Sequence, residues 1–125
     1  MLYDEIGGIG VIEKLVDDFY QIMKNDPEAK DCLATHIGRD MEESATKLKF
    51  FLSGWLGGPQ LYAEKFGHPR LRMRHHTFSI GVKEAEQWLY CMRQALLKST
   101  IPESLRPQLF DSFIQVAQML INRQN

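Results

Sequence analysis

The chain has few cysteines, little net charge and no long apolar run. Cys32 and Cys91 are the only two cysteines among 125 residues, too few for a disulfide framework, and their apolar neighbours suggest buried free thiols. The 15 basic and 16 acidic residues give a net charge of −1, which argues against a nucleic-acid surface built on bulk charge. No run is long enough for a membrane span, and no signal-peptide pattern is visible at the N-terminus. We therefore expect a cytoplasmic protein without nucleic-acid or membrane partners.

Length and composition fit a single globular domain over residues 1–125. Hydrophobic residues make up 44% of the chain and charged residues 25%, which is normal for a soluble globular protein. A chain of this length can bury one sizeable core. No linker, low-complexity segment or internal repeat divides it.

Apolar residues recur at helical spacing along most of the chain, and no convincing two-residue alternation competes with that pattern. We therefore predict an all-α fold with four main helices and two short ones. The main helices are expected at about 9–24, 40–56, 82–98 and 104–122.

Local start and stop signals support these boundaries. Asn25-Asp26-Pro27 is expected to end the first helix, and Asp40 to cap the second, which stops at Gly57-Gly58-Pro59. Beyond that stop we expect a loop-rich region to about residue 69 and then a short helix that carries His75. Such a long irregular connection is unusual in a compact bundle, and a bound cofactor would supply the contacts that a missing helix does not.

The most distinctive segment is residues 67–78, where histidines and arginines are concentrated among apolar residues. They are His68, His75 and His76, with Arg70, Arg72 and Arg74. Histidine is a common metal ligand near neutral pH, and the arginine guanidinium matches the shape of a carboxylate. A histidine that binds iron, beside arginines that bind acid groups, is what a haem with two propionates would require. A basic surface turn with one core histidine is the alternative.

Other residues complete a pattern together with this segment. They are Phe19-Tyr20 on the first long helix, Phe51 before the stop at 57–59, the run from Gly67 to His75, Trp88 on the next helix, and the opening Glu5-Ile6-Gly7-Gly8. In this order they resemble the truncated haemoglobins, and among them the group II type. The resemblance extends over residues from about 3 to 122.

This resemblance implies a truncated-globin fold, a two-over-two helical sandwich around haem b. The helices at about 9–24 and 40–56 would form one pair, and those at about 82–98 and 104–122 the other. The resemblance also implies that His75 is the proximal iron ligand. Spacing alone does not choose between His75 and its neighbour His76, but the family motif ends at His75.

The resemblance further implies a distal pocket in which Tyr20 and Trp88, beside Phe19, donate hydrogen bonds to the iron ligand. Without it, Tyr20 would be a core tyrosine bonded to a backbone carbonyl, and Trp88 would simply fill a helical stripe. His36 is a further distal candidate. Its segment is longer than in a typical member, so Leu33 is a rival occupant and a solvent-facing loop histidine is the alternative.

The remaining candidates would surround the haem. Ser44 and Leu48 would lie over the iron, with Phe51 and Leu52 on the same helix face; for the apolar residues, simple core packing is the alternative. The candidates for binding the propionates are Tyr62, His68, Arg72 and Arg74, and for each arginine a solvated surface position is the alternative. Burial of the porphyrin's apolar face should dominate its affinity.

We therefore expect a haem protein that binds oxygen, nitric oxide and carbon monoxide, and that releases oxygen slowly. The alternative is a redox enzyme, for nitric oxide dioxygenation or a peroxidase-like reaction. Such an enzyme would require a separate reductase, because the chain has no flavin or nicotinamide motif. A third hypothesis is a cofactor-free helical interaction module. Exposed aromatics such as Tyr3 and Phe66 would allow weak association, so we expect a monomer or a weak dimer.

Overall fold

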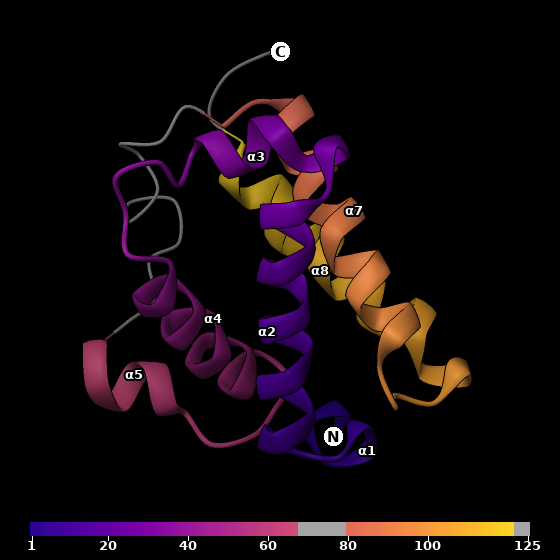
Figure 1. Ribbon diagram of the computed structural model, residues 1–125. Coiled ribbons are helices and arrows are strands. Elements are labelled where there is room, and N and C mark those ends of the chain that lie inside the picture. Colours follow the sequence, from indigo (N-terminus) through magenta and orange to yellow (C-terminus); the bar gives the residue numbers. More distant parts are fainter. Residues whose placement is uncertain (68–79, 122–125) are drawn as a thin grey trace.

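The computed structural model describes residues 1–67 and 80–121, and in this part of the chain the regular structure is helical (Figure 1). The elements are α1 (Leu2–Ile6), α2 (Ile9–Asn25), the short 3-10 helix η1 (Pro27–Ala29), α3 (Lys30–Ala34), α4 (Met41–Trp55), α5 (Leu61–Phe66), α7 (Val82–Lys98), the 3-10 helix η2 (Glu103–Leu105) and α8 (Arg106–Leu120). The four long helices lie close to their predicted positions. Within the described ranges, no helix is both long and apolar enough to cross a membrane.

The four long helices pack as two pairs. α2 packs against α4, α7 packs against α8, and α2 also contacts α7, which joins the pairs. Figure 1 shows α2 near the centre, with α4 and α5 on one side and α7 and α8 on the other. The two-over-two arrangement expected from the sequence is confirmed.

The helix ends follow the local sequence signals. α2 ends at Asn25, where Asp26 turns to an extended backbone and its carboxylate accepts a hydrogen bond from the Glu28 N–H at 3.0 Å. The Asp40 carboxylate accepts from the backbone N–H groups of Glu42 and Glu43, at 3.0 and 3.2 Å. These contacts satisfy backbone donors that the first turn of a helix leaves without partners.

The predicted stop at Gly57-Gly58-Pro59 also provides the surface against which the N-terminal helix α1 packs. Gly57 has a φ of 93°, which favours glycine. The Tyr3 N–H donates to the Leu56 carbonyl at 3.0 Å, and the Tyr3 ring lies against Gly58. A Cβ at Gly58 would be 2.3 Å from Tyr3 Cδ2, so the absence of a side chain allows α1 to approach.

Part of the region predicted to be loop-rich is helical. α5 follows the stop after a short turn and packs against α4, through residues that include Phe66 and Phe50, whose ring centroids are 6.5 Å apart. Phe66 and Tyr3, expected to be exposed, are instead half-buried and pack against the core. Trp55 belongs to the apolar stripe of α4, which should be buried, but it is 39% exposed and stacks on Phe51.

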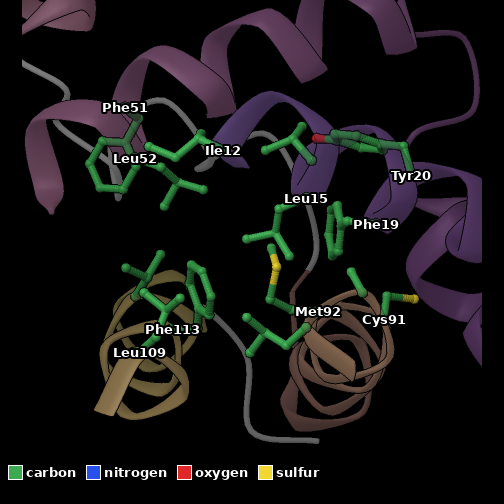
Figure 2. Packing of buried hydrophobic residues seen from close by; sticks show 14 of the residues in the cluster. Ile12, Leu15, Phe19, Tyr20, Phe51, Leu52, Cys91, Met92, Leu109 and Phe113 are labelled. Carbon is green, nitrogen blue, oxygen red and sulfur yellow. The ribbon is translucent and has the colours of Figure 1, made fainter. Parts of the chain in front are cut away.

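The core lies where α2, α4, α7 and α8 meet. Figure 2 shows its central part, with α2 contributing Ile12, Leu15 and Phe19, α7 contributing Met92, and α8 contributing Leu109 and Phe113. Cys32 and Cys91 are both buried and free, which confirms the prediction made from their apolar neighbours.

Candidate functional site

The site begins with two neighbouring aromatic residues near the end of α2. Phe19 is fully buried and Tyr20 is nearly so. Their rings meet edge to face, with centroids 4.9 Å apart and planes at 75°. Figure 2 shows both rings projecting from α2 into the buried cluster. The apolar stripe of α2 directs these rings inward because its other residues must be buried on the same face.

Trp88 reaches the same cluster from α7. Its indole lies edge to face against Phe19, with centroids 5.3 Å apart, and against Phe113 of α8 at 6.1 Å. Trp88 is half-buried, whereas both phenylalanines are fully buried. Phe19 therefore stands between Tyr20 and Trp88, so the two predicted donors come together from different helices.

His36 reaches the same cluster from the segment after α3. Its imidazole lies edge to face against Tyr20, with ring centroids 5.9 Å apart and planes at 82°. The imidazole Nδ1 is 3.1 Å from the Cys32 carbonyl oxygen and 3.1 Å from Thr35 Oγ1. Leu33, the rival occupant, is half-buried and packs against the core. Of these two candidates, the structure pairs His36 with the Tyr20 ring.

Burial sets the protonation state of Tyr20. Desolvation raises the pKa of its phenol well above the usual value, and proximity to Cys32 raises it further. Tyr20 is therefore a neutral O–H group at physiological pH. The Trp88 indole nitrogen can only donate a hydrogen bond. Among residues 1–67 and 80–121, neither the Tyr20 hydroxyl nor the Trp88 N–H forms a hydrogen bond.

The predicted cofactor-facing residues of α4 and α5 differ in burial. Phe51 and Leu52 are buried in the core, whereas Ser44 and Leu48 are half-buried on α4. Tyr62 on α5 is buried, and its ring centroid is 4.9 Å from that of Phe66. These side chains therefore belong to the α4–α5 side of the molecule, with Phe51 and Leu52 reaching the shared core.

The predicted iron ligand and most of the predicted propionate-binding residues lie outside the described residues. These residues are His68, Arg72, Arg74 and His75. Within the described part, no group of three or more His, Cys, Asp or Glu side chains could hold a metal ion. The described half of the site is thus the aromatic cluster around Tyr20 and Trp88.

Sequence reasoning missed a set of polar contacts that join α7 to η1 and α3. The Gln87 side chain binds both Asp31 and the Cys32 backbone, each at 2.8 Å. The Tyr90 hydroxyl donates to Asp26 Oδ2 at 2.6 Å, and the Lys83 ammonium lies 3.4 Å from Asp31. The only sequence signal is the spacing of 83, 87 and 90, which puts three polar residues on one side of a helix but is equally typical of a solvated face.

The whole chain is similar to proteins of one family. The family model described as bacterial-like globin matches residues 1–122. The group 2 truncated hemoglobin YjbI of Bacillus subtilis (strain 168) is 36% identical over 121 residues, covering 97% of this chain and 88% of that protein. The group II 2-on-2 hemoglobin from the plant pathogen Agrobacterium tumefaciens has a TM-score of 0.90 and 38% identity, covering 99% of this chain and 95% of that one. The cold-adapted truncated hemoglobin from the Antarctic marine bacterium Pseudoalteromonas haloplanktis TAC125 has a TM-score of 0.91 and 38% identity, with 98% of each chain covered.

Proposed function

The chain belongs to the bacterial-like globin family as a group II truncated haemoglobin, a haem globin that binds gases, and on this premise we propose that it retains oxygen through hydrogen bonds donated by Tyr20 and Trp88. The observation that carries this proposal is the convergence of these two donors on one cluster, through the ring of Phe19. Nitric oxide and carbon monoxide are diatomic ligands of similar size, and we propose that the same site binds them.

The described residues fit a haem on one side of such a site. Tyr20 and Trp88 bring two polar donors into a mainly aromatic cluster, and neither donor makes a hydrogen bond with another described residue. A donor that makes no hydrogen bond within the cluster is available to a bound ligand. When bound, haem b supplies iron with an open coordination position for a gas.

We assign the residues that would hold this cofactor as follows. His75 is the proposed iron ligand, and Phe51, Leu48 and Leu52 are proposed to lie against the apolar face of the porphyrin. Ser44 is proposed to line the distal side, where its small side chain leaves a route of entry. The residues proposed to bind the propionates are Tyr62, His68, Arg72 and Arg74.

The chemistry of this chain's own residues favours slow release. The Tyr20 phenol stays protonated because burial raises its pKa, so it donates at any physiological pH. Donors fixed in a pocket of low dielectric stabilise partial negative charge on a ligand more strongly than water would. Each ~1.4 kcal/mol of such stabilisation slows ligand escape about tenfold when entry is unchanged. We therefore propose oxygen retention, sensing or redox chemistry in preference to a rapid shuttle.

Haemin titration into the purified protein tests the cofactor assignment. We expect the wild-type protein to develop a strong Soret band, which His75→Ala loses and His76→Ala keeps. The proposal is wrong if the wild-type protein does not take up haemin. Retention of the wild-type band by His75→Ala, with its loss in His76→Ala, would move the iron ligand to the neighbouring histidine.

A further inference from the structure

The short helix α3 has no side-chain cap of its own. Its N-cap position is Ala29, whose side chain cannot accept a hydrogen bond. The backbone N–H groups in the first turn of a helix need partners from elsewhere. One of them, the Cys32 N–H, donates to Gln87 Oε1 of α7 at 2.8 Å, although the two residues are 55 positions apart. Gln87 thus acts as the missing cap from a different helix.

The other end of the same amide is also engaged. Gln87 Nε2 donates to Asp31 Oδ2 at 2.8 Å, and this bond is the largest cause of a lowered Asp31 pKa. With both ends bound, the amide has one orientation, because exchanging its oxygen and nitrogen would oppose donor to donor and acceptor to acceptor. Gln87 therefore fixes α3 to α7 one residue before Trp88.

The backbone of Cys32, which Gln87 anchors, also contacts the His36 side chain. The Cys32 carbonyl oxygen accepts from the Thr35 hydroxyl at 2.6 Å and lies 3.1 Å from His36 Nδ1. A carbonyl oxygen has no proton to donate, so this bond requires a proton on Nδ1. Thr35 Oγ1 lies 3.1 Å from the same Nδ1 and gives its own proton to Cys32, so it too accepts from Nδ1. Both contacts select the same tautomer.

We propose that Gln87 is a positioning residue of the gas-binding site: it anchors Cys32, whose carbonyl holds the His36 imidazole with the proton on Nδ1 and Nε2 as an acceptor. In its neutral form His36 then has no second N–H to offer. Donation to a bound ligand then falls to Tyr20 and Trp88, and His36 acts on the site through the contact of its ring with Tyr20. The last step rests on the proposed function, because it takes Tyr20 and Trp88 as the donors to the ligand.

Nitrogen-15 NMR of histidine-labelled protein tests the proposal, because protonated and unprotonated imidazole nitrogens have distinct shifts. The sample is the haem-loaded ferrous protein with carbon monoxide, at about pH 8.5, where histidine is ordinarily neutral. The His36 signals are assigned with His36→Gln. We expect wild-type His36 to carry its proton on Nδ1, and Gln87→Leu to shift the ratio of tautomers toward Nε2–H by about tenfold, the factor that corresponds to roughly one net hydrogen bond.

Two further variants separate positioning from a general loss of stability. Gln87→Glu keeps an acceptor for the Cys32 N–H but places a second carboxylate beside Asp31, so we expect lower stability with the wild-type tautomer. Gln94→Leu removes another half-buried glutamine of α7, two turns further along, and should leave His36 unchanged.

Several results would overturn the proposal: a wild-type His36 protonated on Nε2, an unchanged tautomer ratio in Gln87→Leu, or the same change in Gln94→Leu. If Gln87→Leu does not fold, the proposal is tested by the other two samples. It requires the proton on Nδ1 of His36 both in the wild type and in Gln87→Glu. Failure of the proposed function would be seen separately, as absence of haemin uptake, and the His36 tautomer can then still be recorded in the protein as purified.

Discussion

The ring of Phe19 meets the Trp88 indole edge to face, with centroids 5.3 Å apart and planes inclined by 67°. Phe19 makes a second edge-to-face pair with Tyr20, its neighbour in the chain. Phe19 is fully buried, so its side of both pairs is shielded from water. This single side chain therefore sets the separation of the two proposed hydrogen-bond donors.

Replacement of Phe19 by leucine should weaken the fold at this point. Phe19→Leu removes two aromatic pairs, each worth about 0.5–1.5 kcal/mol beyond the area they bury, so we expect a loss of about 1–3 kcal/mol in the free energy of unfolding. Urea denaturation measures it. The matched control is Phe110→Leu, a half-buried phenylalanine of α8 that forms no ring pair with other described residues. An equal loss in both variants would show that the ring pairs contribute nothing specific.

The Tyr90–Asp26 hydrogen bond should make stability depend on pH at both extremes. This bond lowers the Asp26 pKa, so its contribution is present above the ordinary carboxyl pKa and is lost as the pH falls. It also raises the pKa of Tyr90 from 10.0 to about 12, so the contribution is lost as the pH rises through that interval.

Tyr90→Phe should therefore reduce the free energy of unfolding near neutral pH and flatten its dependence on pH between 10 and about 12. Urea midpoints measured across the pH range test this. Tyr3→Phe removes a hydroxyl from α1, at the opposite end of the molecule from α3 (Figure 1), and serves as the control. A pH profile of Tyr90→Phe that superposes on the wild-type profile would show that the bond contributes no pH dependence.

A side chain at Gly58 should displace α1. A Cβ there would lie 2.3 Å from the Tyr3 ring, so Gly58→Ala should cost about 1–3 kcal/mol, as overpacking usually does. Truncation of the ring should relieve the clash, so Tyr3→Ala and Gly58→Ala should be less than additive in a double-mutant cycle. Gly10→Ala is the control: it lies in the first turn of α2, no atom beyond its chain neighbours and the helix's own backbone is within 4 Å of the added Cβ, and it should not destabilise the fold. Full additivity of the two substitutions would contradict the contact.

The two cysteines should be almost inert in the folded protein. Burial raises the pKa of Cys32 from 9.0 to about 12 and that of Cys91 from 9.0 to about 11. Since the thiolate is the nucleophile, we expect alkylation by iodoacetamide at pH 8 to be at least about a hundredfold slower in native protein than in urea. Mass spectrometry follows both sites in Cys32→Ser and Cys91→Ser. Native rates equal to those of the unfolded chain would contradict the buried positions.

Sequence periodicity predicts the long helices well because each has an apolar face that must be buried. It predicts α5 poorly, because the six residues from Leu61 to Phe66 are too few to show a helical period and follow a strong stop signal. The roles of Asp40 and Gly57 are easier to predict from the sequence, since capping and a positive φ depend on residue type at a single position. Local chemistry is therefore predictable, whereas a short helix held by tertiary packing is not.

In the site, too, the features set by local sequence are predictable and those set by tertiary contacts are not. Phe19 and Tyr20 follow from the α2 stripe, but the pairing of His36 with Tyr20 depends on how α3 is anchored. That anchor is the Gln87 amide, and a glutamine on an amphipathic helix does not reveal its partner 55 residues away. The roles of His75 and of the arginines near it stay predictions from resemblance.

The rate at which oxygen leaves the ferrous protein tests the central claim most directly. Stopped-flow measurement should compare the wild type with the Tyr20→Phe, Trp88→Phe double variant, both loaded with haem and of equal secondary structure. With two donors each worth about 0.5–1.5 kcal/mol, the double variant should release oxygen roughly five- to 150-fold faster than the wild type. Equal rates would show that Tyr20 and Trp88 do not hold the ligand, and would contradict the account.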